Sequence, residues 1–341
     1  HLKIGHNRKI HATKEFQLSC FSQLSLFLFF LSSLFLCFFF ATTTTSFFFV
    51  SSFHTIIPRV GKTWTMSGIR SNPGIQPRSV SEIFAIVERD SDKYDFKVSV
   101  YMIEMYLEGL NDLLIGLPGG EQMGKFDRKG GLKVMKDARG RVQVGGVTQM
   151  FARSASEMSN ILSSGQSKRH VASTKMNSES SRSHLVSSII IEATDKKTKL
   201  TTKGKLTLVD LAGSESQKKT GATGDQLKEA MAINGSLSAL GNVISALTSN
   251  QKHIPYRNSK LTELLQDGLG GNAKTLLFVN ASPADYNFNE TCGSFEFALR
   301  CKKVKNGKGA AAVETAEVSK LKKELQKLRA LHGDAEQTDL Q

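Results

Sequence analysis

The chain has 341 residues, 40% of them hydrophobic, and a formal net charge of +14 at pH 7. This length suits one large domain or two small ones, and the charge favours an acidic partner: nucleic acid, an anionic membrane or an acidic protein polymer. Because the basic regions carry no RNA-binding signature and no interleaved aromatic residues, we expect no nucleic acid. The four cysteines show no metal-ligand spacing, which indicates free thiols in a reducing compartment.

Residues 1–59 differ in composition from everything that follows. Residues 21–40 form an uncharged run of Phe, Leu and Ser that is long enough for a transmembrane helix. The run also resembles a signal-peptide core, although no small-residue cleavage site is clear. A third interpretation fits better, because pyrimidine-rich codons encode these residues, as in a polypyrimidine tract before a splice acceptor. We therefore expect an intron-derived or mispredicted leader, and a membrane anchor is the less favoured alternative.

The first motif with chemical content is Gly61-Lys62-Thr63, which should open a helix over residues 62–66. A lysine here can reach the β- and γ-phosphates of a nucleotide, and a threonine can ligate Mg²⁺. A complete phosphate-binding loop has a glycine five residues before Gly61. Ile56 stands at that position, and Pro58 lacks an N–H donor, so the loop is incomplete.

The next segments predict a helix over residues 79–89, a strand over 96–107, hairpins within 132–147 and a helix over 154–164. Ser154 and Glu157 form a capping box at the start of the last helix. A hydroxyl-rich loop follows, Asn177-Ser178-Glu179-Ser180-Ser181-Arg182-Ser183-His184. Its hydroxyls suit Mg²⁺ and phosphate oxygens; the alternative is a solvated serine-rich loop.

A buried parallel strand is predicted at residues 205–210, followed by a turn of small residues. Asp210, at the carboxyl end, could hold the water shell of a phosphate-bound Mg²⁺. Ala212 and Gly213 would let a backbone N–H approach a terminal phosphate. Glu215 adds a second carboxylate, with which Arg182 could pair.

The last part of the chain predicts a long helix over residues 227–249, whose Leu237, Leu240, Ile244 and Leu247 form an apolar face for core packing. A strand is expected at 275–281. A small-residue linker at 307–312 leads to a basic amphipathic helix at 318–331. This helix could be a calmodulin target, a short coiled coil or a membrane-surface helix.

Three motifs occur in a specific order: Asn-x-x-Ser-Ser-Arg-Ser-His at 177–184, Asp-Leu-Ala-Gly-Ser-Glu at 210–215 and Tyr-Arg-Asn-Ser-Lys-Leu-Thr at 256–262. Gly61–Thr63, the motif at 177–184 and the motif at 210–215 closely resemble, in this order, the P-loop, switch I and switch II of the kinesin motor domain. The motif at 256–262 also resembles a segment of that domain, and the resemblance covers about residues 60–305. The resemblance implies an α/β, P-loop NTPase-like core with a mixed central sheet flanked by helices. It also implies that the first third is missing, that 60–306 is a partial motor domain, and that 307–341 is a linker with its helix.

The resemblance further implies an ATPase that uses ATP and Mg²⁺ to move on microtubules. Its expected location is the cytoplasm, in association with the microtubule cytoskeleton. The residues implied in catalysis are Ser181, Arg182, Gly213 and Glu215. Those implied in nucleotide binding are Gly61, Lys62, Thr63, Asn177, Ser180 and Asp210, with Thr63, Ser181 and, through water, Asp210 holding Mg²⁺. Those implied in tubulin binding are Lys218, Lys219, His253, Arg257 and Lys260.

Within the family, residues 218–221 and 226–230 and the final basic helix resemble plant C-terminal-motor kinesins of the kinesin-14 type that bind calmodulin. Calmodulin binding is accordingly expected at residues 313–332. Gly235 departs from the lysine that the family has between Asn234 and Ser236, which removes one basic contact. Because the P-loop is incomplete, we expect poor ATP hydrolysis from this chain. The competing functions are a nucleotide-incompetent microtubule-binding module and a membrane-anchored protein.

Overall fold

The computed structural model describes residues 47–54, 61–123, 131–137, 140–175, 182–213, 224–271, 273–281 and 284–305. The chain divides into two units, His1–Ser46 and Phe47–Gln341, and every described residue belongs to the second. Residues 21–40, residues 55–60 and the helix predicted at 318–331 lie outside the described residues. The expectations for those segments remain predictions.

The described strands form an eight-stranded sheet in the order β12-β1-β11-β10-β4-β9-β6, with β5 paired to β4. Strand β10 runs antiparallel to both β4 and β11, whereas β1 runs parallel to β11 and β12, so the sheet is mixed, as predicted. The strands are β1 (Phe47–His54), β4 (Tyr94–Tyr106), β5 (Gly109–Asp112), β6 (Glu121–Gln122), β9 (Thr148–Ala152), β10 (His184–Asp195), β11 (Thr201–Asp210) and β12 (Lys274–Asn280). Two small hairpins pair β2 (Gly68–Ile69) with β3 (Asn72–Pro73) and β7 (Lys133–Lys136) with β8 (Val142–Gly145).

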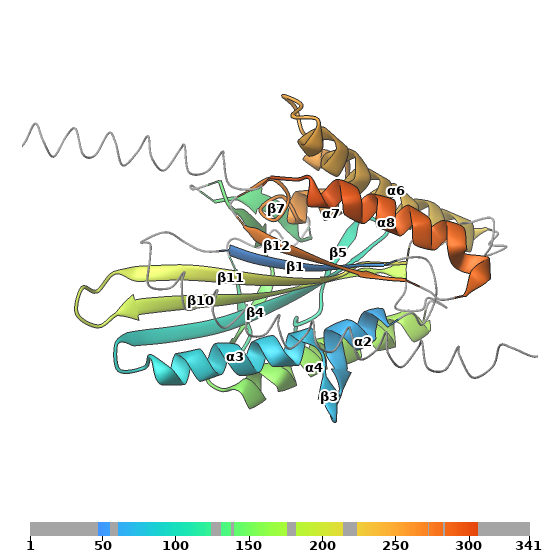
Figure 1. The fold of residues 1–341 in the computed structure, drawn as a ribbon. Helices are drawn as coiled ribbons and strands as arrows, with labels where there is room; N and C mark the ends of the chain where they lie inside the picture. The colour runs from blue at the N-terminus through green and yellow to red at the C-terminus, as the bar shows by residue number, and fades with distance from the viewer. Residues whose placement is uncertain are drawn as a thin grey trace, which may run out of the picture. The chain divides into compact units, whose positions relative to one another are not determined.

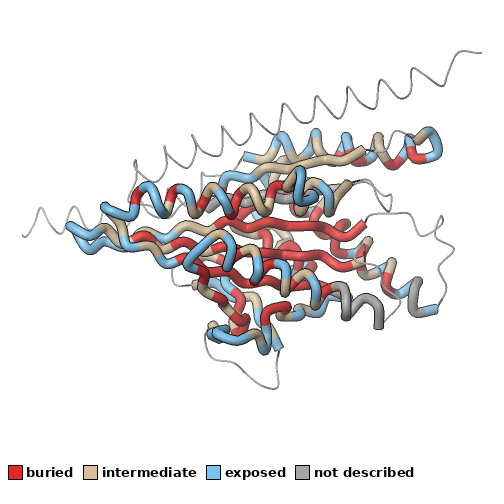
Figure 2. Tube along the Cα trace, turned by 90° about the horizontal axis from the view of Figure 1, so that it is seen from below, coloured by how far each residue is buried: buried red, intermediate tan, exposed pale blue. Residues whose placement is uncertain are grey.

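Helices cover both faces of this sheet (Figure 1). One face carries α2 (Lys62–Ser67), α3 (Ile75–Arg89) and α4 (Ala155–Lys175). The other carries α6 (Asp225–Thr248), α7 (Lys260–Leu264) and α8 (Phe288–Lys302). The central strands form the buried layer between the two sets of helices (Figure 2). The predicted cap of α4 is present, because Ser154 Oγ accepts the Glu157 N–H at 3.1 Å.

Strand β1 corrects the prediction for the region before Gly61. We expected no strand there, yet Phe47–His54 lies between β11 and β12, with Phe47 opposite Lys205 and Ser52 opposite Asp210. A run of Phe and Val is strongly β-prone, and the position between two parallel neighbours pairs backbone groups on both edges. The β-propensity of these side chains is the signal from which the strand could have been predicted.

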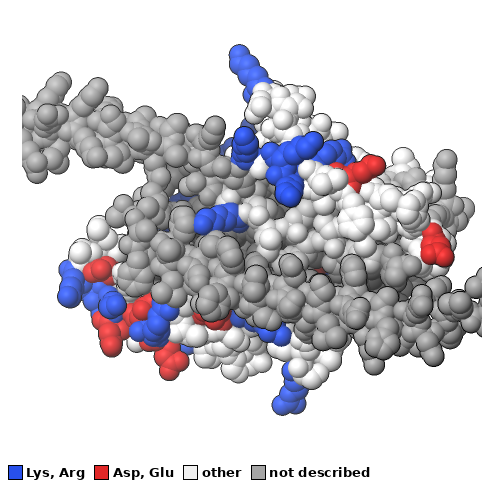
Figure 3. Space-filling view, in the orientation of Figure 1, with Lys and Arg blue, Asp and Glu red and all other residues white. Residues whose placement is uncertain are grey.

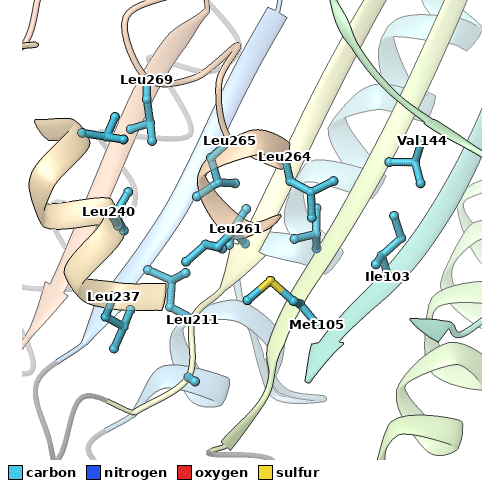
Figure 4. Packing of buried hydrophobic residues seen from close by; sticks show 14 of the residues in the cluster. Ile103, Met105, Val144, Leu211, Leu237, Leu240, Leu261, Leu264, Leu265 and Leu269 are labelled. Carbon is cyan, nitrogen blue, oxygen red and sulfur yellow. The ribbon is translucent and has the colours of Figure 1, made fainter. Parts of the chain in front are cut away.

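The main hydrophobic core lies between the sheet and the helices α6 and α7 (Figure 4). Three residues of the predicted stripe, Leu237, Leu240 and Ile244, are buried there, and Leu247 packs against them half-buried. The same helix is long and apolar enough at Leu227–Thr248 to cross a membrane by length and composition. Its buried face accounts for that hydropathy as core packing.

The hairpin between β4 and β5 turns on two residues in the left-handed region, Leu107 at φ 48° and Glu108 at φ 60°. Leucine is unsuited to this conformation because its Cβ crowds the backbone. Glu108 anchors the turn to α7: its carboxylate accepts the Lys260 N–H at 2.7 Å and the Ser259 hydroxyl at 2.5 Å. The hairpin thereby caps α7, the helix that follows the predicted tubulin-binding residues His253 and Arg257.

Replacing Leu107 with asparagine should raise the free energy of unfolding by about 1 kcal/mol, since asparagine tolerates the left-handed region. Half of the leucine side chain is exposed, so little buried area is lost. Urea denaturation measures the change. Leu107→Ala is the control, because alanine removes the same side chain without relieving the strain. Equal stability of the two variants would contradict the expectation.

Candidate functional site

The amino end of α2 lies at the carboxyl ends of parallel strands. Helix α2 contacts both β1 and β11, and Ser52 near the end of β1 stands beside Asp210 at the end of β11. Gly61 precedes the helix with φ 95°, a conformation that favours glycine. The structure therefore places the start of α2 and Asp210 at the same end of the sheet. A helix start at such an edge is suited to binding phosphate.

Asn280, at the end of β12, fixes the first turn of α2. Its amide nitrogen donates to Thr65 Oγ1 at 3.1 Å, and the Thr65 hydroxyl donates to the Gly61 carbonyl at 2.8 Å. Asn280 is not among the predicted site residues. Its position at the carboxyl end of the last parallel strand is the signal that could have found it.

A buried arginine that is also not among the predicted site residues organises the environment of Asp210. Arg169 of α4 is 1% exposed, and its guanidinium lies 3.3 Å from Asp210 Oδ2 and donates to the Ser183 carbonyl at 2.8 Å. Glu104 joins the same cluster, because its Oε1 accepts the Ser183 hydroxyl at 2.7 Å and lies 3.8 Å from the Arg169 Nε. These contacts hold the end of β11 against α4 and against Ser183, just before β10.

Asp210 fits a role at a metal ion held by phosphate. Arg169 occupies its Oδ2, whereas its Oδ1 is buried and has no hydrogen-bond partner among the described residues. Buried carboxylate oxygens are normally satisfied, so this oxygen is suited to accepting from a water of a Mg²⁺ shell. No group of three or more His, Cys, Asp or Glu side chains within the described ranges could hold a metal ion alone.

Among the described residues, Arg182 pairs with a carboxylate that the sequence motifs do not include. Its guanidinium pairs with Glu229 Oε2 of α6 at 2.8 Å, where the carboxylate is almost buried and the arginine is half-buried. Burial, followed by interaction with this carboxylate, raises the pKa of the Tyr106 hydroxyl. Glu215, the predicted partner, lies outside the described residues, so the predicted pair remains a prediction. The arginine is thereby linked to α6.

Gly213 and His184 complete the described part of the site. Gly213 is buried just beyond β11, and the N–H of the preceding Ala212 donates to His184 Nδ1 at 3.0 Å. Burial, then the charges of Arg169 and Lys62, lower the pKa of His184 to about 3. The remaining predicted nucleotide and catalytic residues, Asn177, Ser180, Ser181 and the Thr63 side chain, lie outside what the structure describes.

The predicted tubulin-binding residues that the structure describes lie in and after the loop following α6. His253, Arg257 and Lys260 are all exposed, and Lys260 pairs with Glu263 at 2.7 Å. Arg257 belongs to the 3₁₀ turn Tyr256–Asn258, which contacts both α6 and α7. Figure 3 shows Lys and Arg side chains on the side of the sheet that carries these helices, and others, partly mixed with Asp and Glu, on the opposite side. Lys218 and Lys219 lie outside the described residues.

A mixed sheet with a helix start and an aspartate at one edge defines a P-loop NTPase-like α/β protein. The kinesin motor domain family matches residues 59–304, and the chain belongs to the kinesin family. Its fold class is therefore as predicted.

Similar plant proteins agree with the predicted subclass. The chain is 49% identical over 263 residues to kinesin-like protein KIN-14E of Arabidopsis thaliana, and 48% identical over 263 residues to KIN-14I of Oryza sativa subsp. japonica. Each match covers 77% of this chain and 20% of the relative, so the chain spans about a fifth of their length.

Solved structures show the same fold. A fast kinesin matches with a TM-score of 0.67 and 39% identity, over 76% of this chain and 72% of the other. A KIF14 dimer in the two-heads-bound state, with AMP-PNP and in complex with a microtubule, matches with a TM-score of 0.66 and 31% identity, over 77% and 73%.

Proposed function

We propose that the described residues form the core of a cytoplasmic, microtubule-associated motor that couples ATP hydrolysis to movement. The observation that carries this proposal is the meeting of α2, Asp210 and Arg182 at one sheet edge, with Arg182 linked to α6. In that arrangement, the presence or loss of a bound phosphate could move α6 and so change the position of the exposed loop that carries His253, Arg257 and Lys260. The similar KIF14 structure, which has AMP-PNP and a microtubule, supports both ligands.

The chemistry would divide among few side chains. Lys62, Asn177 and Ser180 would bind the phosphates. Thr63 and Ser181 would hold Mg²⁺ directly and Asp210 would hold it through water, and the ion would neutralise charge on the β- and γ-phosphates. The Gly213 N–H would contact the terminal phosphate. Arg182 would leave Glu229 to pair with Glu215, which would orient the attacking water.

A second candidate, a microtubule-binding module without nucleotide, is favoured by Ile56 and Pro58. Trp64 distinguishes the two, because it is the only tryptophan in the chain, lies two residues after Lys62 and is 49% exposed. Titration with Mg-ATP should change its fluorescence saturably, and Lys62→Ala should abolish the change while the surface variant Lys197→Ala keeps it. No change in the parent chain, together with co-sedimentation with microtubules, would favour the second candidate.

Replacing Arg257 and Lys260 together with alanine should weaken microtubule affinity on the order of tenfold and reduce its salt dependence, because both charges would face an acidic polymer. Co-sedimentation across ionic strength measures the effect. The matched control is Lys197→Ala with Lys203→Ala, because Lys203, like Lys260, forms a surface ion pair, at 2.6 Å to Glu192. An unchanged salt curve in the first variant would show that these residues are only solvated.

Gly235 offers a test of the missing basic contact. A Cβ built at Gly235 meets nothing within 4 Å, so alanine and lysine should each stabilise α6 by about 1 kcal/mol. Gly235→Lys should also raise microtubule affinity, whereas Gly235→Ala should not. Thermal denaturation and co-sedimentation measure the two effects. A gain in affinity from alanine as well would assign it to helix stability rather than charge.

For residues 313–332, resemblance to the calmodulin-binding kinesins supports a calcium-dependent calmodulin site that hinders microtubule binding. Titrating calmodulin onto a peptide of these residues, with calcium and with chelator, tests it. Absence of calcium-dependent binding at micromolar concentration would leave a plain tail helix.

A further inference from the structure

A buried chain of hydrogen bonds joins the turn after β11 to helix α6 through one imidazole ring. The Ala212 N–H donates to His184 Nδ1 at 3.0 Å, and His184 Nε2 lies 2.9 Å from Ser236 Oγ. The Ser236 hydroxyl donates to the Ile233 carbonyl at 2.7 Å, one turn earlier in α6. Ala212, His184 and Ser236 are each at most 2% exposed.

The direction of each hydrogen bond is fixed by the groups available. A backbone N–H can only donate, so His184 Nδ1 must accept. Because the single Ser236 hydroxyl proton goes to Ile233, the ring proton must be on Nε2 and donate to Ser236. All donors therefore point from the turn towards α6, and aligned bonds of this kind strengthen one another. The pKa of about 3 keeps the ring neutral, so this arrangement persists at neutral pH.

We propose that His184 is a positioning residue that transmits displacement of the Ala212–Gly213 turn to α6, and displacement of α6 back to the turn. This proposal rests on the proposed function. The hydrogen-bonded chain through His184 would be the mechanical link between the turn that contacts phosphate and helix α6, which lies beside the loop that carries His253, Arg257 and Lys260. Helix α6 contacts both α7 and the turn Tyr256–Asn258. The Arg182–Glu229 pair also joins the segment just before β10 to α6. Its arginine side chain is 30% exposed, unlike the buried groups around His184.

Residue-resolved hydrogen exchange of the free chain tests the link without nucleotide or microtubules. Ser236→Ala should accelerate exchange of the Ala212 amide on the order of fivefold, because the ring loses the partner that orients it. Ser188→Ala is the matched control. This serine is fully buried in β10, the strand that also carries His184, and its hydroxyl lies 3.1 Å from the Thr207 hydroxyl. An unchanged Ala212 amide in Ser236→Ala would overturn the proposal.

A second measurement separates transmission from simple support. Microtubule binding should change exchange of the Ala212 amide in the parent chain and in Ser188→Ala, since coupling between two sites is reciprocal. Ser236→Ala and His184→Asn should still co-sediment but lose most of this response; asparagine keeps an acceptor near Nδ1 but does not reach Ser236.

The outcomes remain distinguishable. If the parent chain binds microtubules without a response at Ala212, or if Ser236→Ala keeps the full response, the proposal fails. If the parent chain does not co-sediment, the proposed function fails instead, and exchange in the free chain still decides whether the link exists.

Discussion

Replacing Arg169 with methionine should lower the free energy of unfolding by about 3–5 kcal/mol, because it leaves buried carboxylates without their cation. Asp210 and Glu104 both lie within 4 Å of this guanidinium and are less than a tenth exposed. Denaturation with guanidinium chloride, monitored by circular dichroism, measures the loss of stability. Arg89→Met is the contrast: Arg89 pairs with Asp90 at 2.6 Å but is 44% exposed, so its loss should cost less than 1 kcal/mol.

A double-mutant cycle assigns the cost to charge rather than to lost packing. Glu104→Gln removes one of the two carboxylates but keeps an acceptor for the Ser183 hydroxyl. Combined with Arg169→Met, it should recover at least about 1 kcal/mol relative to Arg169→Met alone, since contacting residues are not additive. Strict additivity would show that the arginine acts through its shape, and the account of this cluster would be wrong.

The sequence predicts the parts of this fold that rest on local pattern. The stripe on α6 is visible at helical spacing, and Asp210 is expected at the carboxyl end of a buried strand, where the structure places it. Arg169 escaped because the helix over 154–164 was expected to end too early. It continues as α4 to Lys175, and Arg169 then falls seven residues after Leu162 on the face that buries Met158 and Leu162. A charged residue at a core position of an extended helix is the signal that was available.

Contacts between distant segments could not be read in this way. Glu229 lies 47 residues from Arg182, and nothing local selects it over a carboxylate within the motif. Glu108 reaches the start of α7 across 152 residues because a two-residue hairpin aims it there. In both cases tertiary packing chooses between chemically equivalent partners. Strand β1 is different, since the β-propensity of its Phe and Val residues is visible in the sequence itself.

Restoring a glycine-rich loop before Gly61 should raise ATP turnover by about 10²-fold or more. The variant combines Ile56→Gly, Ile57→Gln, Pro58→Thr and Arg59→Gly, which returns the first glycine and the N–H donor that proline lacks. Preorganised donors around a reacting phosphate are each worth roughly 10²–10³ in rate. Phosphate release with and without microtubules measures the gain.

The control keeps three of these changes but places alanine rather than glycine at residue 56, so that only the first glycine differs. Alanine should fall well short, because a Cβ obstructs the tight turn around the phosphates. Since β1 already stands beside β11, and Asn280 already holds the first turn of α2, the repair should act on a prepared sheet edge. Robust turnover by the unmodified chain, equal to that of the repaired one, would show that the phosphate site does not depend on this glycine.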